Sequence, residues 1–337
     1  MRAARCLEYG PPASLVVESV ELPDPGPGEV LVEVHAAAVN FPDVLVVANE
    51  YQIPAPLPFT PGSELAGVVA AVGEGVVDLA IGDQVFGQVF VGAFAEAVVM
   101  PVASLRRIPA AIDVWSAAAF GVAYTTAYHS LRSIGDVHPG DWVLVLGAAG
   151  GVGLAAVELA AALGARVIAA ASSPEKLEQC RAKGATEIVD YEREDLKVRV
   201  KEIRGGGVDV VIDPVGGVMT DAALRATRWG GRYVVVGFAS GEIPRIPANL
   251  VLLKGVIVRG FTLQGLMQYA PDDRARDLDE LFEMLRSGAV RPHVSEVFGL
   301  DDVGKAMARV AERKAIGKVV IDPRAERAVR LDTRGIA

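Results

Sequence analysis

Apolar residues follow two different patterns along this chain of 337 residues. Up to about residue 108, short runs such as Glu29–His35 and Gln84–Phe90 alternate apolar and polar positions, and Gly-rich or Pro-rich turns separate them. Alternation with a period of two is typical of half-buried strands. We therefore expect an irregular, barrel-like β region in the first third of the chain.

From Trp142 to Val236 uninterrupted apolar runs are each followed by a stretch with helical spacing. Strands that are apolar throughout are buried on both faces, which is typical of a parallel sheet covered by helices. The pattern thus predicts a doubly wound α/β domain. Its expected strands cover residues 142–146, 166–170, 187–189, 208–212 and 232–236, and its expected helices 150–163, 174–183, 195–203 and 220–228.

The remaining segments set the expected domain boundaries. An Ala-rich stretch at 116–133 predicts a helix, 256–261 a strand and 276–286 an amphipathic helix, with strand-like segments near Val294 and Val319. We expect residues 1–121, completed by 262–323, to form the β-rich domain, and 122–261 to form the doubly wound domain. The charged residues 324–337 are expected to be a loose tail.

Composition narrows the classes of function. Hydrophobic residues make up 51% of the chain, which is enough for two hydrophobic cores. The formal net charge is 33 − 42 = −9, which disfavours nucleic acid and acidic membranes as partners. The longest uncharged apolar run, Val143–Val157, falls short of the roughly 20 residues that span a bilayer. The first residues lack a secretory pattern. Cys6 and Cys180 are the only cysteines, so we expect a reducing compartment, the cytoplasm.

A glycine-rich loop, Gly147–Gly153, lies between the first strand and the first helix of the doubly wound region. Glycines there allow a tight turn and a close approach of backbone N–H groups to a pyrophosphate at the helix N-terminus. NAD-binding versions place an acid about 20 residues further on, whereas this chain has Ala169–Ser173 followed by Lys176. The pattern favours NADP(H), although Lys176 taken alone is equally typical of a solvated helix.

Zinc ligands are missing from the sequence pattern. The four histidines and two cysteines show no His-x-x-His or Cys-x-x-Cys spacing, and no Gly-x-Ser-x-Gly elbow occurs. We therefore expect the cofactor to carry the chemistry.

Several motifs in order give a family resemblance: Val39–Asp43, Pro61–Gly67, Gly82–Val85, Pro139–Asp141 and Ala148–Gly153. With these motifs the chain resembles the zinc-independent medium-chain dehydrogenase/reductases, in the quinone oxidoreductase branch. The resemblance implies a GroES-like catalytic domain, a Rossmann domain and a nicotinamide bound in a cleft. Zinc-dependent relatives carry a Cys near the position of Asn40 and a His at that of Ser63.

The resemblance also implies roles for individual residues, each with ordinary packing as its alternative. Asn40 and Tyr51 are implied as catalytic, Asn40 for orientation of the substrate and Tyr51 as a hydrogen-bond donor. The implied cofactor contacts are Thr125 beside the nicotinamide, Ala149, Gly150, Gly151 and Val152 at the pyrophosphate, Ser172, Lys176 and Tyr191 at the 2′-phosphate, and Phe238 and Leu263 as nicotinamide walls.

These expectations lead to one functional hypothesis, the reduction of a quinone or an α,β-unsaturated carbonyl by NADPH without zinc. A 2-enoyl thioester reductase and a non-catalytic NADPH-binding protein remain as alternatives. A basic entrance patch would favour the first alternative, but Arg106, Arg107 and Arg132 are scattered in sequence. The apolar segment Val256–Phe261 could pair across a two-fold axis, so we expect a homodimer.

Overall fold

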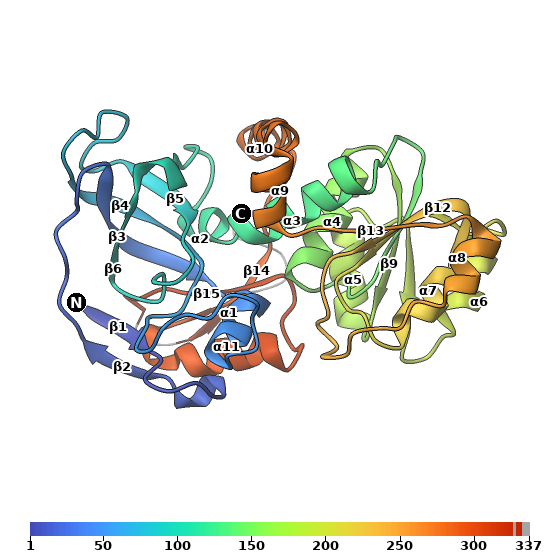
Figure 1. Ribbon diagram of the computed structural model, residues 1–337, viewed down its shortest axis with the longest axis horizontal. Helices are drawn as coiled ribbons and strands as arrows, with labels where there is room; N and C mark the ends of the chain where they lie inside the picture. Colours follow the sequence, from blue (N-terminus) through green and yellow to red (C-terminus); the bar gives the residue numbers. More distant parts are fainter. Residues whose placement is uncertain (326–327, 332–337) are drawn as a thin grey trace. The chain divides into compact units, whose positions relative to one another are not determined.

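A computed structural model describes residues 1–325 and 328–331, and it divides into two units (Figure 1). Unit 1 comprises Met1–Val122 and Arg291–Ala337, and unit 2 comprises Ala123–Val290. The sequence had suggested boundaries at 121/122 and 261/262. The first lies close to the observed division, whereas the second differs by 29 residues, since 290 − 261 = 29.

Unit 1 is built on an eight-stranded sheet in the order β16-β14-β15-β3-β4-β5-β7, with β6 paired to β3. The longest strand is β3 (Glu29–Ala38), whose Val30, Val32 and Val34 alternate into the core as the sequence pattern predicts. The other strands are β4 (Glu64–Val72), β5 (Gln84–Gln88), β6 (Ala97–Pro101), β7 (Leu105–Arg107), β14 (Val294–Phe298), β15 (Lys318–Ile321) and β16 (Val329–Arg330). A separate pair joins β1 (Arg2–Arg5) to β2 (Val16–Ser19).

Strands from the two ends of the chain share this sheet. β15 pairs antiparallel with β3, with Val320 opposite Ala38, and it pairs parallel with β14. Three short α-helices accompany the sheet: α1 (Phe41–Val47), α2 (Val114–Ala118) and α11 (Val303–Ala311). Short 3-10 turns are η1 (Pro12–Ser14), η2 (Val102–Ser104) and η4 (Leu300–Asp302).

Unit 2 contains a six-stranded parallel sheet in the order β10-β9-β8-β11-β12-β13, with helices on both faces (Figure 1). The predicted doubly wound fold is confirmed. The strands are β8 (Trp142–Val145), β9 (Arg166–Ala171), β10 (Glu187–Asp190), β11 (Val208–Asp213), β12 (Thr227–Val235) and β13 (Ile257–Gly260). The helices that follow them are α4 (Gly151–Ala162), α5 (Pro174–Ala182), α6 (Leu196–Ile203), α7 (Met219–Ala226), α8 (Ala248–Lys254) and α9 (Leu263–Tyr269).

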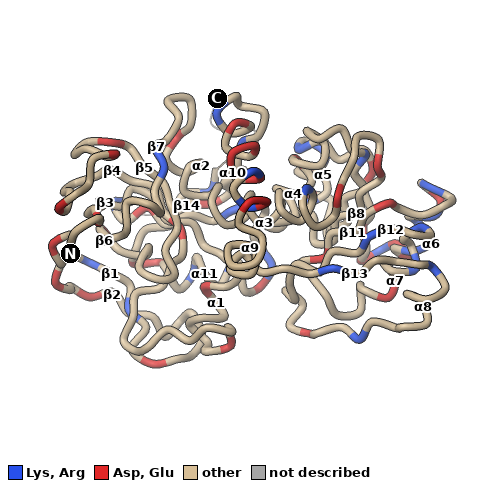
Figure 2. Tube along the Cα trace, turned by 45° about the horizontal axis from the view of Figure 1, so that its top comes forward, with Lys and Arg blue, Asp and Glu red and all other residues tan. Residues whose placement is uncertain are grey.

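Helix α10 (Pro271–Arg286) belongs to unit 2, although the sequence suggested that residues 262–323 complete the first domain. Figure 2 shows charged residues of both signs along α10. Its Asp277 is fully buried and contacts the Nδ1 atom of His129 at 2.7 Å and the hydroxyl of Ser133 at 2.5 Å. His129 ends α3 (Gly121–His129), and Ser133 lies in the π-turn η3 (Ser130–Ile134). These long-range polar contacts hold α10 on unit 2.

Other differences from the expected elements are local. The helix expected at 116–133 is interrupted between α2 and α3, and β12 begins at Thr227, inside the helix expected at 220–228. Of the expected charged tail, Val329–Arg330 pair antiparallel with β14, and residues 326–327 and 332–337 lie outside the described residues. Among the described residues, none of the helices combines the length and apolar character required to cross a membrane.

Candidate functional site

The glycine-rich loop connects β8 to α4 at the carboxyl end of the parallel sheet. Gly147 adopts a positive φ of 55°, and a Cβ atom on Gly153 would lie 2.3 Å from the Gly147 carbonyl oxygen. Larger side chains are therefore excluded at both positions. Ala149 is buried, whereas Gly150, Gly151 and Val152 are partly exposed where α4 begins. The first N–H groups of a helix have no intrahelical partner, so this turn can accept an anionic pyrophosphate.

Three of the residues implied to hold a 2′-phosphate come together at the next two strand ends. Ser172 follows β9, and its hydroxyl accepts a hydrogen bond from the Lys176 ammonium at 3.1 Å. Tyr191 follows β10, and its N–H bonds the carbonyl of Ala171 at 3.2 Å. β9 ends at Ala171 without an acidic residue of its own, and the Lys176 ammonium lies beside Ser172. The Lys176 cation can attract a 2′-phosphate at this position.

Further loops follow β11 and β12, and a buried carboxylate, Asp213, orders the loop after β11. Asp213 Oδ1 accepts the N–H groups of Val215 and Gly216, both at 2.8 Å. Its Oδ2 accepts the hydroxyls of Thr220 at 3.1 Å and Tyr233 at 2.5 Å. The sheet order reverses between β8 and β11, and cofactors of open α/β sheets bind at such a switch point. Asp213 thus shapes a loop beside the expected cofactor position.

The implied nicotinamide walls lie after neighbouring strands. Phe238 follows β12, and a Cβ atom on Gly216 would lie 3.0 Å from its ring, so Phe238 packs against the loop that Asp213 organises. Leu263 begins α9 after β13 and is partly exposed. Thr125 is buried within α3. Phe238 and Leu263 thus share the carboxyl edge of one sheet, while Thr125 is contributed by a helix of the same unit.

In unit 1, Asn40 belongs to a buried polar cluster that the sequence did not reveal. The Lys318 ammonium donates hydrogen bonds to Asn40 Oδ1 at 2.5 Å, Glu64 Oε1 at 2.8 Å and the Val39 carbonyl at 3.1 Å. Asn40 Nδ2 donates to Glu64 Oε1 at 2.9 Å, and Glu64 Oε2 accepts the N–H of Val122 at 2.7 Å. Lys318 and Glu64 are 3% and 1% exposed, so they form an ion pair removed from water.

Asp43 is a second carboxyl in this cluster. Its Oδ2 accepts the N–H of Asn40 at 2.7 Å. Burial raises the pKa of Asp43 to about 7, against the opposing effects of Ser63, Asn40 and the Lys318 charge. Burial and the charge of Asp43 also raise the pKa of Tyr51 above its usual value.

The side chains of this cluster are poorly suited to binding a metal ion. A zinc ion prefers deprotonated Cys, His and carboxylate ligands, whereas here a lysine ammonium already occupies the Glu64 carboxylate beside the amide of Asn40. Within the described ranges, 1–325 and 328–331, the structure contains no group of three or more His, Cys, Asp and Glu side chains placed to hold a metal ion. These residues do not fit a zinc site.

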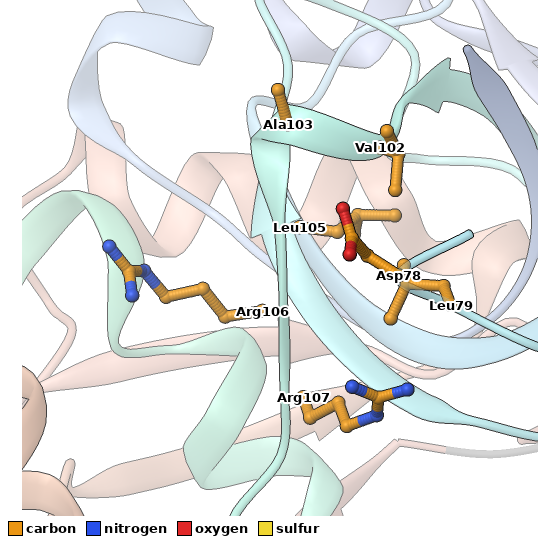
Figure 3. Close-up of a pocket in the computed structure, with 7 residues that line it drawn as sticks. All are labelled: Asp78, Leu79, Val102, Ala103, Leu105, Arg106 and Arg107. Atoms are coloured by element: carbon orange, nitrogen blue, oxygen red, sulfur yellow. The ribbon is translucent and has the colours of Figure 1, made fainter. Parts of the chain in front are cut away.

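A hollow of about 330 Å³ lies elsewhere in unit 1, and none of the implied site residues lines it (Figure 3). Arg106 and Arg107 are successive residues of β7, and their side chains project to opposite sides of the strand. Arg107 donates to Asp83 at 2.8 Å. Because the two guanidinium groups diverge, they do not combine into a single anion-binding surface here.

Comparisons with known proteins agree with this architecture. Residues 26–110 match the alcohol dehydrogenase GroES-like domain, and residues 151–283 match the zinc-binding dehydrogenase family. The quinone oxidoreductase-like protein 2 homolog of Nematostella vectensis is 40% identical over 326 residues, which cover 95% of this chain and 88% of that protein.

Two solved structures are similar over nearly the whole chain. Escherichia coli quinone oxidoreductase complexed with NADPH has a TM-score of 0.88 at 30% identity, covering 96% of this chain and 100% of that one. A mycobacterial protein complexed with NADPH has a TM-score of 0.88 at 33% identity, with coverages of 96% and 100%.

A GroES-like domain joined to a Rossmann domain defines the medium-chain dehydrogenase/reductases, and the chain is of this class. It belongs to the quinone oxidoreductase branch of that family and is therefore an oxidoreductase. The resemblance predicted from the sequence motifs is confirmed.

Sequence analysis did not identify Lys318, Glu64, Asp43 or Asp213 as residues of interest. The only signal for Lys318 was a lysine at the start of a fully apolar strand, Lys318–Ile321, where a buried cation needs a partner. Its partner Glu64 is 254 positions away in sequence, so no local pattern connects the two.

The ion pair leads to a stability prediction. Lys318→Met should lower the unfolding free energy of unit 1 by about 3–5 kcal/mol, because Glu64 would stay buried without its cation. Adding Glu64→Gln should recover much of that loss. The measurement is denaturant unfolding at pH 7 in a Trp142→Phe, Trp229→Phe background, where the remaining tryptophan, Trp115, reports on unit 1. If Lys318→Met alone leaves the denaturant midpoint of unfolding unchanged, the ion pair between Lys318 and Glu64 contributes no stability.

Proposed function

We propose that the protein transfers hydride from NADPH to a quinone or an α,β-unsaturated carbonyl compound without zinc. The observation that carries the proposal is the arrangement at three neighbouring strand ends, a phosphate-binding turn after β8 beside Ser172, Lys176 and Tyr191. Two similar solved structures are NADPH complexes, and the curated relatives include quinone oxidoreductases, which supports the same coenzyme and acceptor class.

The coenzyme supplies the hydride, and the described residues bind and orient it. The turn at Ala149, Gly150, Gly151 and Val152 receives the pyrophosphate, with Lys176 and Ser172 on the 2′-phosphate. Phe238, Leu263 and Thr125 are proposed to border the nicotinamide. The contacts to the pyrophosphate and the 2′-phosphate lie away from the reacting carbon, so they are expected to contribute binding more than rate acceleration.

Replacement of Lys176 tests the coenzyme assignment. Lys176→Ala should raise the KM for NADPH by about tenfold to a hundredfold, the effect of losing a charge-assisted hydrogen bond of about 1.5–3 kcal/mol, while kcat and the KM for NADH barely change. Arg181→Ala, on the exposed surface of the same helix, is the matched control. A wild type that prefers NADH, or equal losses for both coenzymes, would contradict the assignment.

In unit 1, Asn40 and Tyr51 are proposed to face the substrate carbonyl. The amide of Asn40 is held by Lys318 and Glu64, which gives it one fixed orientation. Tyr51 is protonated near neutral pH, and its pKa is raised above the usual value, so it can donate a hydrogen bond to oxygen that gains negative charge. Hydride transfer to an enone or quinone creates such an oxygen.

We propose that the reaction needs no zinc, because Asn40, Ser63 and Glu64 do not provide the ligands that zinc prefers. We expect turnover of NADPH to survive exhaustive treatment with a metal chelator. The assay is NADPH absorbance with 1,4-naphthoquinone before and after chelation, followed by metal analysis of the treated protein. Activity that disappears on chelation and returns on addition of Zn²⁺ would overturn this part of the proposal.

Two alternative functions make different demands on the molecule. A 2-enoyl thioester reductase must also seat a phosphopantetheine or coenzyme A arm, and Arg106 and Arg107, whose side chains diverge, do not form a joint basic patch for it. A non-catalytic NADPH-binding protein needs the phosphate turn but no acceptor. Oxidation of NADPH that starts only when a quinone or enone is added would separate the enzyme from this second alternative.

A homodimer is proposed through the edge of the unit 2 sheet. β13 is the last strand in the order and pairs with β12. Nearby exposed apolar side chains include Ile257 on β13, 53% exposed, and Leu252 on α8, 82% exposed. A second copy could continue the sheet across a two-fold axis and cover these groups.

The free, buried Cys6 and Cys180 accord with the proposed cytoplasmic location.

Light scattering tests the dimer. The wild type should have twice the monomer mass at micromolar concentration, and Ile257→Lys should shift the protein to monomer by placing a charge on the edge strand. Val77→Lys, at an 88% exposed position of unit 1, is the control and should remain dimeric. A monomeric wild type would rule the dimer out.

A further inference from the structure

The loop after β11, residues 214–217, lies between the phosphate-binding turn and Phe238. A Cβ atom on Gly147, in that turn, would lie 2.7 Å from Cγ2 of Val215, so the Val215 side chain packs directly against the turn. On the other side, a Cβ atom on Gly216 would lie 3.0 Å from the Phe238 ring. A shift of this loop would therefore be felt both by the turn and by Phe238.

Backbone hydrogen bonds join the same loop to the loop after β12, which carries Phe238. The N–H of Ser240 donates to the carbonyl of Val215 at 2.9 Å. The N–H of Gly217 donates to the carbonyl of Glu242 at 3.1 Å. The two loops thus support each other, and the conformation of the first helps to determine that of the second.

Asp213 holds the loop after β11 from its buried end. The side chain is 1% exposed, and its Oδ1 accepts the N–H groups of Val215 and Gly216, both at 2.8 Å. The hydroxyls of Thr220 and Tyr233 fix Oδ2. Because a buried N–H without an acceptor is costly, the two bonds to Oδ1 favour the one loop conformation that makes both.

The order of the strands indicates which half of the coenzyme lies over this loop. The phosphate-binding turn follows β8, and Ser172 and Lys176 follow β9, the neighbour of β8 on one side. β11 and β12 lie on the other side of β8. With the pyrophosphate at the end of β8 and the 2′-phosphate at the end of β9, the nicotinamide half extends over the ends of β11 and β12.

We propose that Asp213 is a positioning residue for hydride transfer, because the loop that it orders holds Phe238 in place beside the nicotinamide. This inference rests on the proposed function, in which NADPH is the coenzyme and Phe238 borders its nicotinamide. Asp213 is buried beneath the loop and acts through it. Loss of Asp213 should therefore slow hydride transfer more than it weakens binding of the adenosine half of the coenzyme.

The first test is the rate of hydride transfer in single turnovers of the NADPH-bound protein with 1,4-naphthoquinone or cyclohex-2-enone. Asp213→Ala should lower this rate by about 10²-fold, the effect of displacing a reacting group by about 1 Å. NADPH deuterated at C4 should confirm that the step measured is hydride transfer. The Kd of adenosine 2′,5′-bisphosphate, a probe of the adenosine half, should stay within about twofold of the wild-type value.

A conservative variant tests whether Asp213 acts by ordering the loop. Asp213→Asn keeps one oxygen for the N–H groups of Val215 and Gly216, while the hydroxyls of Thr220 and Tyr233 can accept from the new amide. The rate of hydride transfer should return to within about fivefold of the wild type. A rate as low as that of Asp213→Ala would contradict a role in ordering the loop.

Asp209 provides a matched control at the opposite end of β11. It is 6% exposed, and it accepts the N–H of Trp142 at 2.8 Å and a hydrogen bond from Arg228. Asp209→Ala also removes a buried, hydrogen-bonded carboxylate from this strand, but it leaves the loop after β11 intact. Its rate of hydride transfer should match the wild type, and an equal loss in both variants would reduce Asp213 to a general structural role.

Double variants test whether Asp213 acts through Phe238. Phe238→Ala should slow hydride transfer, and adding Asp213→Ala should slow it little further, because the contact through which Asp213 acts is already lost. Fully additive losses would contradict the proposal.

Gly216→Ala keeps the test decisive if Asp213→Ala does not fold. It leaves Asp213 in place, but its Cβ atom would lie 3.0 Å from the Phe238 ring and should displace it. Hydride transfer should slow, with an unchanged Kd for adenosine 2′,5′-bisphosphate. An unchanged rate would count against the proposal. Circular dichroism checks the fold of each variant.

The fluorescence lifetime of bound NADPH provides a readout independent of turnover. A nicotinamide held in one orientation emits for longer than a mobile one, so Asp213→Ala should shorten the lifetime and Asp209→Ala should not.

The results separate the two proposals. A folded Asp213→Ala protein that transfers hydride at close to the wild-type rate, or whose lifetime is unchanged, would overturn the positioning role alone. A wild type that oxidises NADPH with neither acceptor would overturn the proposed function and the positioning role with it.

Discussion

The ion pair between Lys318 and Glu64 is the contact on which unit 1 depends. Removing two charges from water is costly, and the cost is offset only when the partners meet with good geometry and their remaining hydrogen-bonding groups are satisfied. Lys318 meets this condition through three acceptors, and Glu64 through Lys318, Asn40 and the N–H of Val122. The pair therefore specifies how the C-terminal strand β15, strand β4 and the start of α1 meet.

Unit 2 has a buried carboxylate, Asp213, at the edge of the sheet where we propose that the coenzyme binds. Asp213 accepts four hydrogen bonds, two from backbone N–H groups and two from hydroxyls. A buried carboxylate whose oxygens are satisfied in this way orders the loop that follows β11 without adding a side chain to the cofactor space. The glycine turn after β8 complements it, since Gly147 and Gly153 leave the backbone itself exposed to a ligand.

The two polar sites differ in how their charges are compensated, and this difference suits the proposed chemistry. At the end of β9, Lys176 lies beside hydroxyl groups on a partly exposed surface, a setting for binding an anion. Around Asn40, the charge of Lys318 acts on two buried carboxyls, those of Glu64 and Asp43. The pKa of Asp43 is raised to about 7. The first arrangement suits the proposed binding of a charged coenzyme, whereas the second contains a carboxyl with a raised pKa.

The sequence by itself determined the doubly wound sheet, the position of the phosphate turn and the lack of an acid after β9, because these depend on the period of apolar residues and on short motifs. It also suggested that C-terminal strands join the N-terminal region, and β15 does pair with β3. Only the tertiary structure decided that α10 packs on unit 2 and that Lys318 meets Asn40 and Glu64. Such pairings join side chains that lie more than a hundred positions apart, and local periodicity records that a residue is buried but not which residue it meets.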